Sequence, residues 1–136
     1  MIKDLYDKYL ACGGQISTDT RNIKSNSLFI ALKGKNFNAN LFAAKAINKG
    51  AKYALIDDAK YTIEGKTILV KNCLKSLQKL ANYHRNQFSI PIIGITGSNG
   101  KTTSKELIGS VLNSTFNVLV TDGNLNNHIG VPLTLL

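Results

Sequence analysis

A glycine-rich segment, Gly97-Ser98-Asn99-Gly100-Lys101-Thr102-Thr103, is the feature that most constrains the fold of this chain. An apolar run at residues 90–96 precedes it, and a helix-like stretch at residues 104–112 follows it. A buried strand, a glycine-rich turn and a helix, in this order, form the context in which Gly-Lys-Thr binds phosphate. The sequence therefore predicts an α/β fold with this segment, here called the phosphate loop, between a strand and a helix.

The residue types of the phosphate loop suit an anion. Gly97 and Gly100 let the backbone approach a phosphate closely and adopt positive φ. N–H groups of the turn and of the helix start then point at the anion. Lys101 is predicted to contact the β- and γ-phosphates of a nucleotide, and the Thr102 hydroxyl to bind Mg²⁺, so these two residues are the catalytic candidates. The predicted nucleotide-binding residues are Gly97, Ser98, Asn99, Gly100, Lys101, Thr102 and Thr103.

The phosphate loop departs from the general pattern at one position. That pattern has a glycine five residues before Gly100, where this chain has Ile95, and Gly94 lies one residue too early. What remains is the shorter form G-x-x-G-K-T-T. The alternative is an ordinary glycine-rich turn with a surface lysine, but such turns seldom open a helix with Lys-Thr-Thr behind a buried strand.

A chain of 136 residues suffices for one ordinary domain, or for a small domain and the start of another. Its sequence has no apolar run of membrane-spanning length and no apolar signal core at the N-terminus. We therefore expect a cytoplasmic protein with no membrane partner. Cys12 and Cys73 lie far apart without metal-site spacing, so both are expected to be buried or half-buried thiols rather than part of a disulfide or a metal site.

The net charge of +9 comes from the first part of the chain. Residues 1–89 hold 15 Lys and Arg against 6 Asp and Glu, whereas residues 90–136 hold 2 of each class. A basic segment is compatible with nucleic acid, or with a small polyanion such as a nucleotide diphosphate. The lysines are scattered and not interleaved with aromatic residues, which favours a solvated lysine-rich surface.

Apolar periodicity predicts alternating helices and strands in residues 1–89. The expected helices run from Ile2 to Gly13, from Leu41 to Gly50 with Asn40 as its cap, and from Asn72, also a cap, to about His84. The expected strands are residues 15–18, 28–32, 53–56 and 67–70, with residues 28–32 and 67–70 buried and a polar loop over residues 33–40.

A second segment begins near residue 90, where Pro91 marks an expected strand and the charge balance changes. Residues 117–121 are expected to form a parallel strand, and residues 131–136 to begin a helix with Pro132 in its first turn. Two strands and one full helix cannot cover both faces of a nucleotide-binding sheet. This segment is therefore expected to be part of a larger domain or to be completed by a partner.

Three parts of the sequence together resemble the Mur ligase family. Residues 94–103 are similar to its ATP-binding loop, whose shortened motif accounts for the missing glycine. Residues 19–21, followed by residues 27–34, are similar to a first-domain signature shared by two of its ligases. Residues 121–136 most closely resemble the member that adds a dipeptide.

The resemblance implies an ATP-driven amide synthesis with ATP and Mg²⁺ as cofactors. The γ-phosphoryl group goes to the terminal carboxylate of UDP-N-acetylmuramoyl-tripeptide, and the amine of D-alanyl-D-alanine then attacks the acyl phosphate. Residues 1–89 are expected to form the UDP-substrate-binding domain, and residues 90–136 the first part of the central ATP-binding domain. Because the family has a third domain and further metal ligands, this chain alone is expected to be inactive. We also expect a monomer that does not bind nucleic acid.

By the same resemblance, Ser17, Asp19, Thr20 and Arg21 hold the uridine-diphosphate end of the substrate, with Arg21 as a phosphate fork. Taken alone, residues 19–21 fit a capped turn with a surface ion pair better than they fit a substrate-binding site. Three asparagines are expected to reach substrate or to order the loop near Mg²⁺, although a turn-forming amide cluster has the same pattern. They are Asn124, Asn126 and Asn127.

One stretch departs from the family. The loop after Leu-Lys-Gly usually carries Asp-Gly-His before a phenylalanine, and here it reads Asn38-Ala39-Asn40-Leu41-Phe42. Contacts made through that aspartate or histidine are therefore not expected here. Two other functions compete with the dipeptide-adding ligase: a related ligase that adds a diamino acid or glutamate, and a basic nucleotide- or nucleic-acid-binding module without catalysis.

Overall fold

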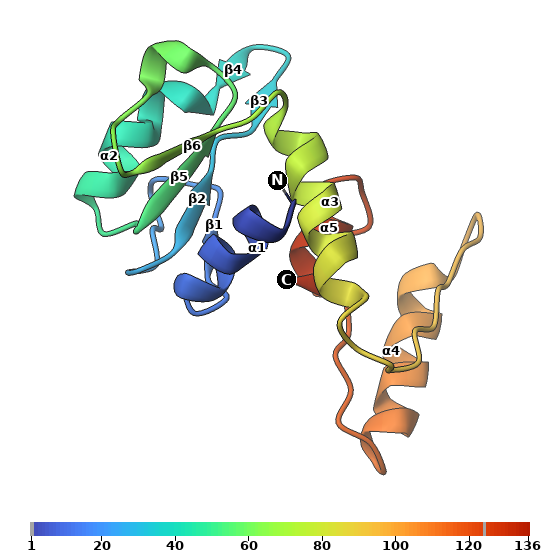
Figure 1. Cartoon of the computed structure of the whole chain (residues 1–136). Helices are drawn as coiled ribbons and strands as arrows, with labels where there is room; N and C mark the ends of the chain where they lie inside the picture. The colour runs from blue at the N-terminus through green and yellow to red at the C-terminus, as the bar shows by residue number, and fades with distance from the viewer. Residues whose placement is uncertain (1, 124) are drawn as a thin grey trace.

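The computed structural model describes residues 2–123 and 125–136. Its centre is a four-stranded parallel sheet with helices on both faces (Figure 1). The strand order is β1-β2-β5-β6. The strands are β1, Ile16–Ser17; β2, Leu28–Ile30; β5, Tyr53–Ile56; and β6, Thr67–Leu69. The predicted α/β class with parallel strands is confirmed.

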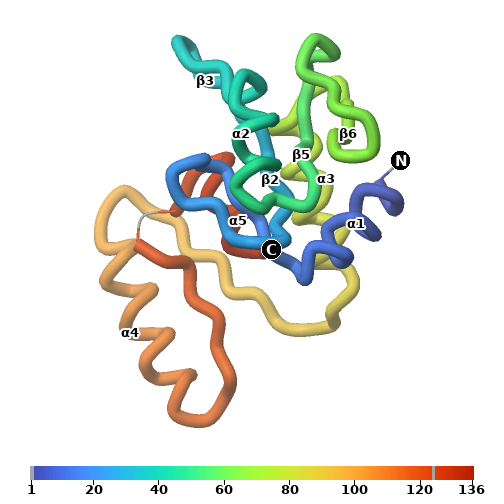
Figure 2. The backbone as a smooth tube through the Cα atoms, turned by 90° about the vertical axis from the view of Figure 1, so that its left-hand side faces the viewer, coloured from blue at the N-terminus to red at the C-terminus, as the bar shows by residue number. Residues whose placement is uncertain are grey.

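The two central strands form the core of the sheet. All three residues of β2 are buried, as are Ala54, Leu55 and Ile56 of β5. Such continuous apolar runs are typical of parallel strands that are covered on both faces. Helix α2, Ala43–Asn48, lies on one face, and helices α1, Ile2–Ala11, and α3, Cys73–Arg85, lie on the other (Figures 1 and 2).

Helix α3 has the cap and the apolar stripe that the sequence predicts. The Asn72 side chain accepts a hydrogen bond from the Lys75 N–H at 2.8 Å. Leu77, Leu80 and Ala81 are buried at the spacing of one helix face.

Both cysteines are free and buried, as predicted. Burial is the main reason that the pKa of the Cys73 thiol rises to about 12. A thiol with so high a pKa is a poor nucleophile, so Cys73 contributes packing rather than chemistry.

Two expectations for the first part of the chain are wrong. Strand β6 was expected to be buried, but Leu69 is 53% exposed because β6 lies at the sheet edge. The expected polar loop contains an antiparallel hairpin, β3 at Lys33–Gly34 and β4 at Phe37–Asn38.

The cap that the sequence assigns to Asn40 is instead made by Asn38. The Asn38 side chain accepts from the Asn40 N–H at 3.1 Å and opens a 3-10 helix, η1, at Ala39–Phe42. Helix α2 follows directly at Ala43. Asn40 itself is fully buried, because its side chain turns inward to other partners. A second 3-10 helix, η2 at Ala59–Tyr61, lies in the loop before β6.

The second part of the chain contains helices α4, Lys101–Asn113, and α5, Gly130–Leu135. The strands expected at residues 90–96 and 117–121 are wrong: within the described part of residues 90–136 no strand forms, so the parallel sheet belongs to the first part of the chain alone. Ile92, Ile93 and Leu119 are more than half exposed. These apolar runs have β propensity, but a parallel strand needs neighbours and covered faces that the two runs do not provide for each other.

Helix α5 packs back against the first part of the chain. It lies along α3, and the Tyr9 hydroxyl of α1 donates to the Leu136 carbonyl at 2.6 Å (Figure 1). A Cβ atom at Gly130 would lie 2.6 Å from the Leu125 Cα, so the tight entry into α5 requires glycine. The domain boundary near residue 89 stays a prediction. Among the described helices, none has the length and hydropathy of a membrane span.

A polar network ties the hairpin to the sheet through Asp57, which directly follows β5. The Asp57 carboxylate accepts from the Lys33 ammonium at 2.9 Å, the Asn40 amide at 2.9 Å and the Cys73 N–H at 3.1 Å. The Asp57 side chain is only 7% exposed. One carboxylate therefore joins β3, η1 and the first turn of α3.

This network predicts acid-sensitive stability. Burial raises the pKa of Asp57, but the Lys33 ammonium, the Cys73 N–H and the Asn40 amide outweigh it and hold the pKa below 3.8. The unfolded chain therefore takes up this proton first, so the contribution is complete above the ordinary pKa and is lost as pH falls through the lowered one. We expect the stability advantage of the wild type over Asp57→Asn, measured by urea unfolding, to be constant well above the ordinary pKa of 3.8 and to shrink as the pH falls through and below that value. A constant difference would contradict this.

Candidate functional site

The phosphate loop forms an exposed turn at residues 97–100 that leads directly into α4. Gly100 has φ +73° and Gly97 has φ +151°, a region of backbone conformation that favours glycine. No described atom lies within 4 Å of a Cβ built at Gly100, so the backbone conformation, rather than crowding, requires glycine there. The expected turn and helix are present, without the expected strand before them.

The N-terminus of α4 is open. Its cap residue, Gly100, provides no side-chain hydrogen bond, and the Ser104 N–H is the first to bond back, to the Gly100 carbonyl at 2.8 Å. The N–H groups of Lys101, Thr102 and Thr103 precede that bond and have no intrahelical acceptor. These donors and the helix dipole together favour an anion at this end of α4.

Lys101 lies over the turn. Its ammonium donates to the Gly97 carbonyl and, at 3.3 Å, to the Ser98 carbonyl. A phosphate oxygen that binds the Lys101 ammonium would have to replace these two carbonyl oxygens. Ser98, Asn99, Thr102 and Thr103 are exposed, so the whole predicted nucleotide-binding set is accessible.

A hydroxyl such as that of Thr102 is a suitable oxygen ligand for Mg²⁺, which usually keeps several waters and binds substrate phosphates. In the described part of the chain, no group of three or more His, Cys, Asp and Glu side chains lies together to hold a metal. The chemistry of the Thr102 hydroxyl fits a Mg²⁺ ion that arrives with a nucleotide and takes further ligands from phosphate oxygens and water.

The segment predicted to bind the uridine-diphosphate end forms a turn with internal partners. The buried Ser17 hydroxyl donates to Ser27 Oγ at 3.0 Å and accepts from the Lys24 N–H at 3.1 Å. The Thr20 carbonyl accepts from the Lys49 ammonium at 2.8 Å. Ser17 thus helps to order the loop after β1.

Asp19 and Arg21 pair with each other in this turn. The Arg21 N–H donates to Asp19 Oδ1 at 2.8 Å, and Arg21 Nη2 donates to Asp19 Oδ2 at 2.6 Å. Hydrogen bonds from the Arg21 side chain and backbone lower the pKa of Asp19 to about 2. The geometry is that of a capped turn with a surface ion pair. Because the Arg21 side chain is 90% exposed, its guanidinium is accessible to a ligand from solvent.

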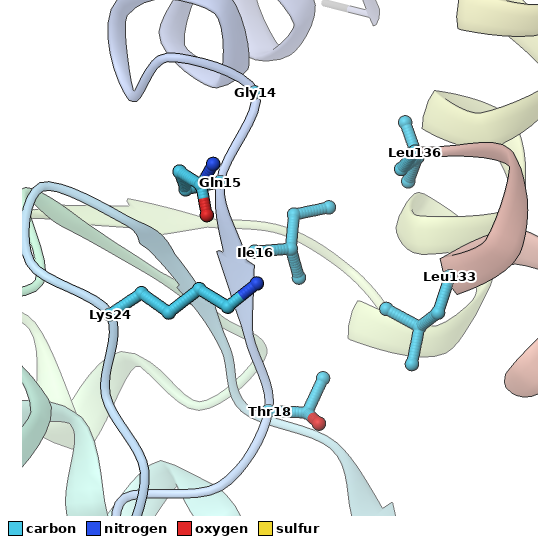
Figure 3. Close-up of a pocket in the computed structure, with 7 residues that line it drawn as sticks. All are labelled: Gly14, Gln15, Ile16, Thr18, Lys24, Leu133 and Leu136. Atoms are coloured by element: carbon cyan, nitrogen blue, oxygen red, sulfur yellow. The ribbon is translucent and has the colours of Figure 1, made fainter.

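A cavity of about 370 Å³ lies beside this turn, between the free edge of β1 and α5 (Figure 3). Lys24 extends toward Ile16, and Leu133 of α5 and Leu136, the residue after this helix, face them (Figure 3). No local sequence pattern marks this cavity, because only the fold brings residues 14–24 and 133–136 together. The cavity is lined by Gly14, Gln15, Ile16, Thr18, Lys24, Leu133 and Leu136.

The loop that carries Asn126 and Asn127, here called the asparagine-rich loop, caps the start of α5. Asn127 Oδ1 accepts from the Ile129 N–H at 2.9 Å and the Gly130 N–H at 2.8 Å, which fixes the start of α5. Asn126 is exposed, and Asn124 lies outside the described residues.

The structure does not bring the two predicted sites together. Figures 1 and 2 show α4 and the phosphate loop standing away from the sheet and from the turn after β1. The asparagine-rich loop connects the two regions, since it leads from the segment beside α4 to α5 on the sheet domain.

Comparison with known proteins gives matches for both parts of the chain. Residues 95–136 match the Mur ligase middle domain. A protein of Buchnera aphidicola is 48% identical over 122 residues, which are 89% of this chain and 26% of the relative. A Bacillus subtilis protein is 42% identical over 123 residues, again 89% of this chain and 27% of the relative.

Solved structures show the same similarity. MurF from Acinetobacter baumannii superposes with a TM-score of 0.81 at 38% identity, covering 89% of this chain and 27% of that one. MurF from Thermotoga maritima in complex with ADP gives a TM-score of 0.80 at 31% identity, covering 89% and 28%. This chain therefore spans little more than a quarter of the length of each of these proteins.

These findings place the chain in the Mur ligase family. Within that family, its similarity is to MurF: the Buchnera and Bacillus relatives are both named UDP-N-acetylmuramoyl-tripeptide–D-alanyl-D-alanine ligase.

Proposed function

We propose that this chain is part of an ATP-dependent ligase that joins D-alanyl-D-alanine to UDP-N-acetylmuramoyl-tripeptide in peptidoglycan precursor synthesis. The observation that carries the proposal is the open N-terminus of α4, with Lys101 and Thr102 in its first turn behind the left-handed Gly100. The names of the Buchnera and Bacillus relatives, and the ADP in the Thermotoga MurF structure, support it.

The phosphate loop would supply positioning and charge for the phosphoryl transfer. A tripeptide carboxylate oxygen attacks the γ-phosphorus of ATP, the bond to the β-phosphate oxygen breaks, and ADP leaves. Lys101 and the first-turn N–H groups of α4 hold the phosphates while negative charge shifts toward ADP. The Thr102 hydroxyl would hold a Mg²⁺ ion together with the phosphates, and that ion would supply further charge neutralisation. The amine of D-alanyl-D-alanine then attacks the acyl carbon, and phosphate leaves as the amide forms.

Residues 1–89 are proposed to bind the UDP end of the tripeptide substrate. The exposed Asp19–Arg21 turn offers guanidinium N–H groups for the diphosphate. Next to it, the cavity offers the Lys24 ammonium and the Thr18 hydroxyl beside apolar walls from Ile16, Leu133 and Leu136 (Figure 3). We further propose that the protein is a cytoplasmic monomer, that it binds neither membrane nor nucleic acid, and that this chain alone is inactive.

Separate calorimetric titrations test the two parts of the proposal. We expect binding heat with UDP-N-acetylmuramoyl-tripeptide, and independently with ADP in the presence of Mg²⁺. Folded protein that gives no heat with the tripeptide would remove the substrate assignment of residues 1–89. Equal affinity for UDP-N-acetylmuramoyl-dipeptide would instead indicate a ligase of another step, and a salt-dependent shift of random DNA in a gel would indicate the nucleic-acid alternative.

A further inference from the structure

A second lysine of α4, Lys105, has a role distinct from that of Lys101. Its ammonium donates to the Thr121 carbonyl at 2.6 Å and to the Gly123 carbonyl at 3.3 Å, and it pairs with Glu106 at 2.9 Å. The Lys105 side chain is 17% exposed, whereas that of Glu106 is 66% exposed. An ammonium has three N–H donors, so these three acceptors use its full capacity.

The carbonyls that Lys105 holds lie at the end of α4 that carries the phosphate loop. Figure 2 shows the chain after α4 running back alongside the helix toward its N-terminal end. Lys105 follows Lys101 by four residues, so the two side chains lie on the same face, about 6 Å apart along the axis. One lysine contacts the turn before the helix, and the other contacts the loop after it.

An independent contact fixes the same returning segment. Gly109 is buried, and a Cβ built there would lie 2.9 Å from Val120 Cγ2. The absence of a side chain at Gly109 therefore lets residue 120 approach the helix backbone closely. Since Lys105 is one turn nearer the N-terminus of α4, the returning chain is held at two successive levels of the helix.

We propose that Lys105 is a positioning residue that holds residues 121–123 beside the phosphate loop and thereby sets nucleotide affinity. The proposal rests on the proposed nucleotide function of that loop. Lys105 does not itself contact nucleotide, because its ammonium is occupied by backbone carbonyls and by Glu106. Without this ammonium, the Thr121 and Gly123 carbonyls lose a charged donor, and the returning segment is no longer held beside the phosphate loop.

The test compares Lys105→Met, which keeps the length of the side chain without its charge, with Lys105→Arg, which keeps the charge. Hydrogen exchange of amides 121–123 reports the position of the segment, and titration with ADP and Mg²⁺ reports affinity. We expect Lys105→Met to accelerate exchange at these amides and to weaken ADP binding about tenfold, with substantial recovery in Lys105→Arg. Lys79→Met, which removes an exposed lysine of α3, is the matched control and should change neither readout.

The outcomes separate this inference from the function on which it rests. If wild-type protein fails to bind ADP, the nucleotide function is wrong and the role of Lys105 in affinity is overturned with it. If wild-type protein binds ADP and Lys105→Met binds equally well, only the positioning role is wrong. Unchanged exchange at residues 121–123 in Lys105→Met would also overturn it, because the segment then does not depend on the ammonium.

Discussion

Replacing Lys101 by alanine is expected to weaken binding of ADP with Mg²⁺ by about 100-fold. The Lys101 ammonium is the positive side-chain charge in the first turn of α4, and its present acceptors are neutral loop carbonyls that a phosphate replaces easily. Charge-assisted hydrogen bonds to phosphate are about twice as strong as neutral ones. Calorimetric titration, or displacement of a fluorescent nucleotide, measures the loss.

The fold should survive this substitution. The Lys101 ammonium donates to carbonyls of the exposed phosphate loop, and alanine is the best helix former for the first turn. We therefore expect an unchanged far-UV circular dichroism spectrum and unfolding midpoint. Lys79→Ala on α3 is the charge-matched control and should bind ADP as the wild type does. Equal affinity in Lys101→Ala and wild type would remove Lys101 from the site and, with it, the main support for the proposed function.

The sheet domain was largely predictable because its signals are local. The run Leu28-Phe29-Ile30 and the run Tyr53-Ala54-Leu55-Ile56 read as strands, and both are central in the sheet. The Asn72 cap and the apolar stripe after it were also readable, since cap chemistry and helical spacing depend on residues within a few positions. The hairpin at residues 33–38 carries no strand signal in the sequence, because its strands are only two residues long and neither contains an apolar run.

The second part of the chain shows where local signals fail. Residues 90–96 and 117–121 have the composition of buried parallel strands, but pairing depends on partners distant in the sequence. Conversely, no sequence signal indicates that Leu133 and Leu136 line one cavity with residues of the β1 edge. The phosphate loop itself was readable at residue level, because the requirement for positive φ at Gly100 and the Lys-Thr-Thr helix start are local.

Asn40 departs from the family pattern and forms hydrogen bonds that join η1 to the end of β5. It stands where the resemblance leads one to expect histidine, and it is fully buried. Its amide nitrogen donates to Asn38 and Asp57, and its amide oxygen accepts from the Asp57 N–H at 3.0 Å. The Asn40 side chain therefore forms hydrogen bonds with both the carboxylate and the backbone N–H of Asp57, which follows β5.

Replacing Asn40 by leucine is expected to destabilise the protein by about 2–4 kcal/mol. Leucine is similar in size, so the cost comes from polar groups rather than from a cavity. The Asp57 N–H loses its acceptor, and the Asp57 carboxylate loses one of its donors while its side chain remains 7% exposed. Urea unfolding at neutral pH, with the slope checked against the wild type, measures the change.

The control uses an asparagine from the same hairpin. Asn36 lies exposed between β3 and β4, and Asn36→Leu is expected to change the unfolding free energy by less than about 0.5 kcal/mol. A double-mutant cycle with Asp57→Asn then isolates the pair, because residues that share hydrogen bonds give non-additive costs. If Asn40→Leu costs no more than Asn36→Leu, or if its cost simply adds to that of Asp57→Asn, the network does not hold the hairpin to the sheet.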